Sequence, residues 1–248
     1  MRILFLCAHP DDSEFTSGNT EVMAVKRGHE VIIACMTSDE YGTRQKDFKG
    51  RRIRQIRIRE MEKAAKIVGA KLDWLGFIDG YLTFSKKSFS ILKKYIERVN
   101  PDIIFAPDPQ YTLDFHPDHV NTGRLIYLIL KQMKPHPILL YFHTLKPDYF
   151  VPCLERKIAR DAFACHVSQD FSRKGAQSLQ TIMQVIYGIR MPKHFLAEGF
   201  RRIQFESADN SLSASQKILY WISRTISNVT LFGNDHYLPS PKELGLIQ

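Results

Sequence analysis

Short apolar runs alternate along the chain with longer stretches in which apolar residues recur every three to four positions. The runs are rich in β-branched and aromatic residues, which predicts buried strands at residues 2–8, 30–36, 71–75, 102–106 and 138–142. The longer stretches predict helices at residues 17–27, 52–68, 88–99 and 120–131. Strands that alternate with helices in this way predict an α/β fold with a mostly parallel β-sheet flanked by helices on both faces.

Two charged residues interrupt the apolar face of the helix predicted at 52–68. At 3.6 residues per turn, Arg57 and Glu60 fall inside a face formed by Ile53, Ile56, Met61, Ala64, Ile67 and Val68. A charge on a core-facing stripe needs a partner or a task, because burying it alone is costly. Two interpretations remain open: Arg57 and Glu60 form a structural pair, or Arg57 reaches a substrate hydroxyl or anionic group at the sheet edge.

Composition narrows the class of protein. Of the 248 residues, 44% are hydrophobic and 25% are charged, as in ordinary soluble globular proteins. No apolar run approaches the ~20 residues that span a bilayer. The apolar opening runs directly into His9-Pro10-Asp11-Asp12, which favours a buried first strand over a signal peptide. We therefore expect a cytoplasmic protein without membrane insertion.

Charge and the C-terminal region bear on partners. The net charge of +9 and the pI near 9.4 indicate attraction to anions. No zinc finger or RNA-binding aromatic motif accompanies the charge, so we expect no nucleic-acid partner. We expect a single domain over residues 1–248, with residues 203–248 as a C-terminal helical extension. Within it, residues 217–232 have the spacing of an amphipathic helix, which packs on its own domain, on a second copy in a homo-oligomer, or on a membrane surface.

Two polar motifs lie where the predicted sheet would bind a ligand. His9-Pro10-Asp11-Asp12 directly follows the first strand, and His116-Pro117-Asp118-His119 follows the strand that ends at Ala106. Because ligands of open α/β sheets bind beyond the carboxyl ends of the strands, both motifs are expected at one edge. A nucleotide-cofactor dehydrogenase needs a Gly-x-Gly-x-x-Gly turn after the first strand. The histidine and carboxylates found there argue against that class.

The two motifs contain the donors of a hydrolytic zinc site. His9, Asp12 and His119 can supply three protein ligands and leave one position for water. Asp11 then remains beside the metal as a base toward that water, and His116 can face the same cavity. Taken singly, each motif also fits a surface turn in which an aspartate caps the following helix. Taken together at one sheet edge, they favour the metal site.

The sequence resembles the PIG-L/LmbE-like zinc N-deacetylases. Residues 8–14 match the family's Ala-His-Pro-Asp-Asp followed shortly by Glu, and residues 116–119 match its His-Pro-Asp-His. Weaker likenesses are Arg57-Ile58-Arg59-Glu60 to Arg-x-x-Glu, Asp79-Gly80-x-Leu82 to another shared segment, and residues 197–200 to the closing strand of one branch. The resemblance covers roughly residues 1–202, so the C-terminal extension is divergent.

The resemblance implies a fold, a cofactor and residue roles. The fold would be Rossmann-like, with Zn²⁺ held by His9, Asp12 and His119. Asp11 would be the general base, His116 would stabilise or protonate the tetrahedral intermediate, and Asp118 would orient His116. Next to His116, Phe115 stands where one branch often has arginine, and Asp114 where another has tyrosine.

We therefore predict a zinc-dependent hydrolase that removes an acetyl group from an N-acetylated amino sugar or sugar conjugate. Arg57 and Asp79 are the candidate substrate-binding residues, although Asp79 with Gly80 equally fits a simple turn. The alternatives are a zinc amidase or esterase acting on another acyl substrate, and a non-catalytic basic binding module of the same fold. The intact set of His9, Asp11, Asp12, His116 and His119 weighs against the binding module.

Overall fold

The computed structural model describes residues 1–112, 116–169, 173–191 and 193–205. Seven strands form a sheet in the order β3-β2-β1-β4-β5-β7-β6. The strands are β1 (Arg2–Cys7), β2 (Glu30–Thr37), β3 (Lys71–Phe77), β4 (Ile103–Pro107), β5 (Ile138–Phe142), β6 (Tyr149–Pro152) and β7 (Ala197–Arg202). The first five pair in parallel, and β7 runs antiparallel to both β5 and β6. The predicted α/β fold with a mostly parallel sheet is confirmed.

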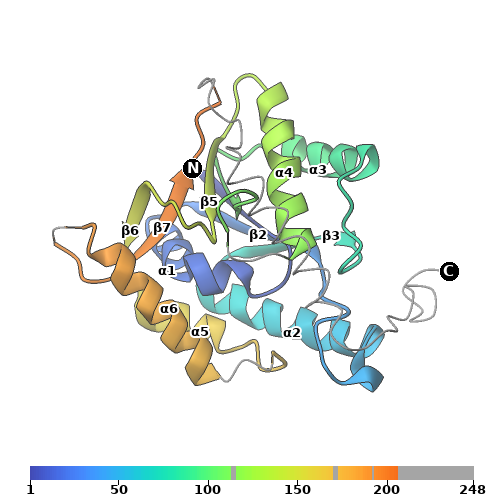
Figure 1. The fold of residues 1–248 in the computed structure, drawn as a ribbon, viewed down its shortest axis with the longest axis horizontal. Coiled ribbons are helices and arrows are strands. Elements are labelled where there is room, and N and C mark those ends of the chain that lie inside the picture. The colour runs from blue at the N-terminus through green and yellow to red at the C-terminus, as the bar shows by residue number, and fades with distance from the viewer. Residues whose placement is uncertain (113–115, 170–172, 192, 206–248) are drawn as a thin grey trace.

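Helices cover both faces of the sheet, as predicted (Figure 1). They are α1 (Asp12–Lys26), α2 (Arg51–Val68), α3 (Lys86–Val99), α4 (Pro117–Gln132), α5 (Arg156–Phe163) and α6 (Arg173–Gly188), with a short 3-10 helix, η1 (Lys46–Phe48). The α3 and α4 helices pack on one face, and α1 and α2 pack on the other. The α5 helix packs against α1 and α2, and α6 packs against β7.

Alternate residues of the central strand β1 build the two hydrophobic cores. Leu4 and Leu6 lie in the core that contains Leu92 of α3, and all three side chains are fully buried. Phe5 lies in the opposite core with Met61 of α2. Successive side chains of a strand point to opposite faces, so a strand buried on both sides has to be apolar at every position.

The largest error in the predicted helices lies at the start of α1. This helix begins at Asp12, five residues before the expected start at Ser17, and its first turn of Asp12, Ser13 and Glu14 is buried. A polar first turn suggested a loop because polar residues are mostly exposed. In α2, Arg57 is buried and Ile67 is 41% exposed, so the expected inward position of Ile67 is wrong.

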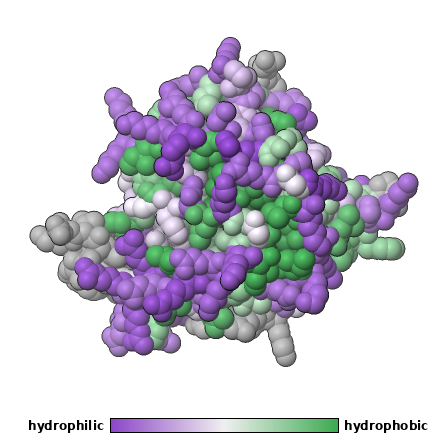
Figure 2. Space-filling view, turned by 180° about the vertical axis from the view of Figure 1, so that it is seen from behind, coloured by the Kyte–Doolittle hydropathy of each residue, from purple (hydrophilic) through white to green (hydrophobic). Residues whose placement is uncertain are grey.

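Three elements of the structure were not predicted, and the helix expected near the C-terminus cannot be compared with the structure. The sequence pattern gave no indication of β6, α5 or α6. The amphipathic helix expected at 217–232 lies outside the described residues. No helix among those described is both long enough and apolar enough to cross a bilayer. The surface seen from behind carries hydrophilic areas around smaller hydrophobic ones (Figure 2).

We expect Leu92→Ala to lower the free energy of unfolding by about 2–5 kcal/mol, because it leaves a cavity in a close-packed core. Ile91→Ala on the same helix is the matched control, since Ile91 is 37% exposed and Leu92 is fully buried. Chemical denaturation measures both. Equal losses in the two variants would contradict the packing of α3 described above.

Candidate metal centre

The sheet topology brings the two histidine motifs together. Strands β1 and β4 are parallel neighbours, with Phe5 paired to Phe105, so their carboxyl ends lie side by side. His9 follows the end of β1, and His119 lies in the first turn of α4. His9 Nδ1 is 2.9 Å from His119 Nε2. Asp12 Oδ1 is 3.2 Å from the same His119 nitrogen.

The backbone holds the Asp12 carboxylate in place. Its Oδ2 accepts hydrogen bonds from the backbone N–H groups of Ala8 at 2.8 Å and His9 at 2.9 Å, which leaves Oδ1 directed at His119. Burial alone raises the pKa of Asp12, but the neighbouring His119 and His9 rings bring it below its usual range. Asp12 is therefore an ionised carboxylate between two imidazoles.

The donor set fits a metal ion. One ligand atom each from His9, Asp12 and His119 lie within 4.8 Å of one another, and all three residues are buried. Imidazole nitrogen and carboxylate oxygen are ligands that catalytic zinc sites use. Two other groups of the described residues meet the same distance criterion, and both also use His9: His9 with His116 and Asp118, and His9 with Asp39 and Asp79.

The two nitrogens of His9 separate these groups. While Nδ1 faces His119, Nε2 lies 3.0 Å from Asp79 Oδ1 and 3.5 Å from Asp118 Oδ2. A metal-binding histidine commonly holds a carboxylate on its second nitrogen, which fixes the tautomer and orients the ring. The geometry therefore favours His9, Asp12 and His119 as the ligand group, with Asp79 and Asp118 supporting His9.

Both oxygens of Asp79 are engaged within the protein. Oδ1 contacts His9, and Oδ2 accepts a hydrogen bond from the Tyr41 backbone N–H at 3.0 Å. Burial raises the pKa of Asp79, but the contact with His9 lowers it by a larger amount, so the net shift of the pKa is downward. Substrate binding by Asp79 stays a prediction, and its contacts point to orientation of His9.

Asp11 differs from its neighbour Asp12 in exposure and conformation. Its side chain is 24% exposed, whereas that of Asp12 is 5% exposed. Asp11 has φ 89°, in the left-handed region that aspartate tolerates better than most residues, and it precedes the first residue of α1. Burial raises the pKa of Asp11, while Arg57 opposes the shift. The carboxylate on the open side of the site is thus Asp11.

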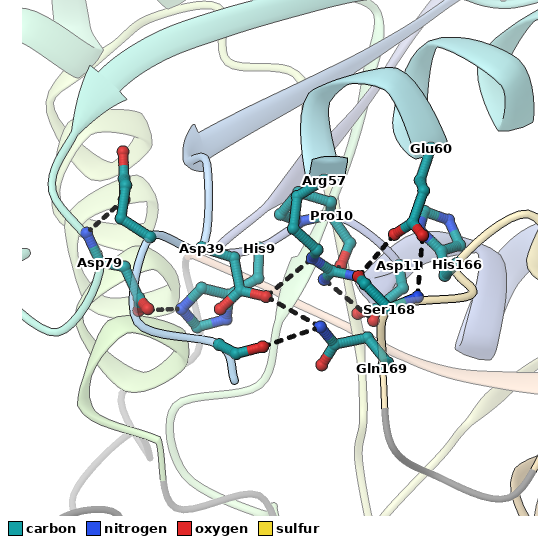
Figure 3. Close-up of polar contacts among 12 residues, drawn as sticks. His9, Pro10, Asp11, Asp39, Arg57, Glu60, Asp79, His166, Ser168 and Gln169 are labelled. Carbon is teal, nitrogen blue, oxygen red and sulfur yellow. Dashed lines mark hydrogen bonds and ion pairs between the residues drawn. The ribbon is translucent and has the colours of Figure 1, made fainter. Parts of the chain in front are cut away.

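Arg57 is a buried cation among three carboxylates (Figure 3). Its side chain is 1% exposed, and Nη2 donates to Asp11 Oδ2 at 3.0 Å and also to the Pro10 carbonyl. Nε pairs with Asp39 Oδ2 at 2.8 Å, and Nη1 lies 3.9 Å from Glu60 Oε2. The expected pair with Glu60 is therefore the longest of these contacts. Arg57 holds Asp11 in position, and its binding to substrate stays a prediction.

A segment from the second half of the chain completes this network. The Ser168 backbone N–H and hydroxyl donate to the two oxygens of Glu60 at 2.8 and 2.7 Å. The Gln169 amide donates to the Gly42 carbonyl at 3.1 Å and to Asp39 Oδ2 at 3.4 Å. Figure 3 shows both residues beside Arg57 and Asp39. The loops after β2 and α5 are thereby joined at the edge of the site.

His116 is held through the backbone of its own motif. Its Nδ1 accepts a hydrogen bond from the Asp118 N–H at 3.2 Å and so caps α4. Burial and the nearby His9 and His119 rings lower the pKa of His116 to about 4. The ring is then neutral near pH 7, and its proton is on Nε2. The Asp118 carboxylate accepts from the Gly80 N–H at 2.8 Å, so its predicted orienting of His116 stays untested.

The structure adds residues that sequence reasoning missed. Asp39 pairs with Arg57, and the His143 ring stacks on His119 with centroids 5.7 Å apart. Asp39 follows β2 and His143 follows β5, so the rule that located His9 at the end of a strand could have indicated both. Asp114 and Phe115 lie outside the described residues.

Comparisons with known proteins agree with this geometry. Residues 4–130 match the PIG-L family, described as GlcNAc-PI de-N-acetylase. That match covers about half of the chain. The chain belongs to the PIG-L family.

Relatives of the PIG-L chain extend the match beyond that region. Diacetylchitobiose deacetylase of Thermococcus kodakarensis is 27% identical over 221 aligned residues, which cover 81% of this chain and 82% of that protein. The structure of N,N'-diacetylchitobiose deacetylase from Pyrococcus horikoshii has 26% identity and a TM-score of 0.78, with 86% and 88% of the two chains covered. Mycothiol S-conjugate amidase of Streptomyces coelicolor is 26% identical over half of each chain. The predicted family and the hydrolysis of an amide bond are confirmed.

We expect His119→Ala to lose bound metal, because the change removes one of the three predicted protein ligands. His116→Ala should keep the metal, since His116 belongs to none of the ligand positions assigned above. Elemental analysis of both purified proteins at equal concentration measures the difference. Metal retained in full by His119→Ala, or lost equally in both variants, would contradict the ligand assignment.

Proposed function

We propose that this PIG-L chain is a zinc-dependent N-deacetylase that removes the acetyl group from an N-acetylglucosamine-type amino sugar or its conjugate. The observation that carries the proposal is the arrangement of the two neighbouring aspartates. Asp12 is buried and directed at His119, whereas Asp11 is partly exposed beside the same group. In this proposal, adjacent residues serve as a metal ligand and as a second, partly exposed carboxylate, which metal-assisted amide hydrolysis needs.

Asp11 is suited to the role of general base. Zinc, when bound, polarises the amide carbonyl and lowers the pKa of its water toward ~7. Asp11 takes a proton from the attacking water and delivers one to the departing amine. Arg57 Nη2 donates a hydrogen bond to Asp11 Oδ2 at 3.0 Å, which holds the carboxylate in place. The other oxygen of Asp11, Oδ1, then serves in the proton transfer. General acid–base groups of this kind contribute about 10²–10⁴-fold to turnover.

His116 is suited to stabilise the negative oxygen of the tetrahedral intermediate. Its Nδ1 is occupied by the Asp118 N–H, so its Nε2–H is the group that can donate. The lowered pKa, about 4, favours a neutral donor over an imidazolium. A preorganised neutral donor also stabilises an oxyanion, because it is already oriented before charge develops.

The substrate class rests on the family and its relatives. Two of the relatives above are named for the deacetylation of diacetylchitobiose, a saccharide with two acetamido groups. The likeness to the mycothiol conjugate amidase covers only half of each chain, so an amidase acting on another acyl group is the weaker candidate. A binding module without turnover would have no use for a base held by a buried arginine.

The direct test is acetate release from N-acetylglucosamine and diacetylchitobiose. We expect acetate from at least one of them, loss of activity after chelation, and recovery on addition of Zn²⁺ at one equivalent. An assay of acyl analogues without an amino sugar, run in parallel, separates the alternative. Turnover of those analogues alone would contradict the proposed substrate class.

Asp11→Asn should retain the metal and lose roughly 10²-fold or more in turnover, because it removes the base without removing a ligand. Asp39→Asn is the matched control, since Asp39 also pairs with Arg57 but stands outside the proposed proton path. Steady-state kinetics and metal analysis measure both. Near-normal turnover in Asp11→Asn would exclude Asp11 as the base.

Arg57→Ala should lower the free energy of unfolding by about 3–5 kcal/mol, because it leaves buried carboxylates without their cation. Arg59→Ala on the exposed side of α2 is the control and should stay within about 0.5 kcal/mol of the parent. Chemical denaturation gives both values, and kinetics gives KM. A small loss of stability with a raised KM would instead support direct substrate binding by Arg57.

A further inference from the structure

Two arginines meet between α5 and α6, and no carboxylate of the described residues pairs with either of them. Arg156 and Arg160 lie four residues apart on α5, and the Nη2 atoms of both approach the Thr181 hydroxyl of α6, at 2.7 and 3.5 Å. Thr181 donates its own proton to the Gln177 carbonyl at 2.8 Å. Its oxygen therefore serves as an acceptor for the two guanidinium groups. Such a hydroxyl carries no charge to offset two cations.

The neighbouring acids have other partners. Glu155 pairs with Lys26 at 2.6 Å, and Asp161 pairs with Lys157 at 2.8 Å. Within the described part of the chain, no carboxylate forms an ion pair with Arg156 or Arg160. The Nε atoms of both arginines are buried there without a hydrogen-bond partner. Burial and the adjacent Arg160 charge lower the pKa of Arg156, as expected for a cation that lacks compensation.

The two side chains line a surface pocket of about 430 Å³. Its other lining residues are Lys157, Asp161, Ala164 and Gln177. Three cations and one carboxylate give the lining a net positive charge. Each guanidinium has four N–H donors on its two Nη atoms, and the contacts with Thr181 use one from each. The remaining donors, in a planar fork, match the geometry of an oxyanion such as phosphate.

The pocket is formed by α5 and α6, which pack beside α1. The α1 helix begins at Asp12 and ends at Lys26, so its 15 residues span about 22 Å. Lys26 contacts Glu155, the residue before Arg156. Ala159, next to Arg160, packs against Gly18 in the middle of α1. Gln180, next to Thr181, donates to the Glu14 and Phe15 carbonyls in the first turns of α1. None of the residues that line the pocket is a proposed metal ligand or the proposed base.

We propose that Arg156 and Arg160, with the Thr181 hydroxyl between them, form a binding site for a phosphate group. This inference does not depend on the proposed deacetylase activity. The phosphate has two possible sources, a small soluble phosphate or the headgroup of an anionic lipid. The α6 helix, which carries Thr181, also has exposed apolar side chains at Leu179, Ile182 and Ile186. Such side chains can contact a lipid surface, so a lipid headgroup is one of the two sources to test.

The test is calorimetric titration of the metal-loaded protein with inorganic phosphate at low ionic strength. Any phosphate bound at the metal is common to all variants, so the site is defined by the difference between them. Arg160→Gln should weaken the affinity by on the order of tenfold or more, because it removes a charge-assisted contact. The one side-chain hydrogen bond that Arg160 makes with the described residues is long, at 3.5 Å, so the fold should tolerate the change. The double change of Arg156→Gln and Arg160→Gln should abolish the binding that depends on the arginines and leave only any phosphate bound at the metal.

The control is the double change of Lys87→Gln and Lys94→Gln on α3, where both side chains are exposed. It removes the same net charge and should leave phosphate affinity unchanged. Sedimentation with phosphatidylcholine vesicles, with and without phosphatidic acid, then separates the sources. Arginine-dependent binding to the acidic vesicles assigns a lipid headgroup, and its absence assigns a soluble phosphate. Equal phosphate affinity in the parent and both arginine variants overturns the proposal.

Discussion

The parallel pairing of β1 with β4 is the constraint on which the site depends. These strands are distant in sequence but adjacent in the sheet, and the strand order reverses between them. Where the strand order reverses, the connections leave the two parallel strands toward opposite faces of the sheet, and a crevice opens beyond their carboxyl ends. His9 and His119 enter that crevice from opposite sides, with ring nitrogens 2.9 Å apart. No local feature of either motif alone would bring these groups together.

Burial of charge then determines how the residues around the crevice are arranged. Arg57 lies at the centre of one group of acids, and His9 lies at the centre of another, formed by Asp12, Asp79 and Asp118. Asp12, Asp39, Asp79 and Asp118 each have a cation, an imidazole or a backbone N–H as a partner, which offsets the cost of removing them from water. Asp11 takes part in the Arg57 group yet keeps part of its surface open. Its proposed role as base follows from this intermediate position.

Sequence reasoning located the sheet and the ligand edge because both follow from local patterns. The apolar strands at β1, β2 and β4 and the two histidine motifs that follow β1 and β4 were visible in the order of residues. The partners of Arg57 were less accessible, because Asp39 belongs to a different loop and the tie to Ser168 joins distant parts of the chain. The early start of α1 was missed because its buried first turn is polar, and polar burial depends on tertiary contacts that no periodicity records.

The central claim is that one metal ion is bound by His9, Asp12 and His119, and not by either of the overlapping groups that share His9. Anomalous diffraction at the zinc absorption edge, from crystals of the zinc-loaded protein, tests this directly. The account predicts a single strong peak within bonding distance of His9 Nδ1, Asp12 Oδ1 and His119 Nε2. A peak on the opposite side of the His9 ring, bonded to Asp39 and Asp79 or to His116 and Asp118, would contradict it.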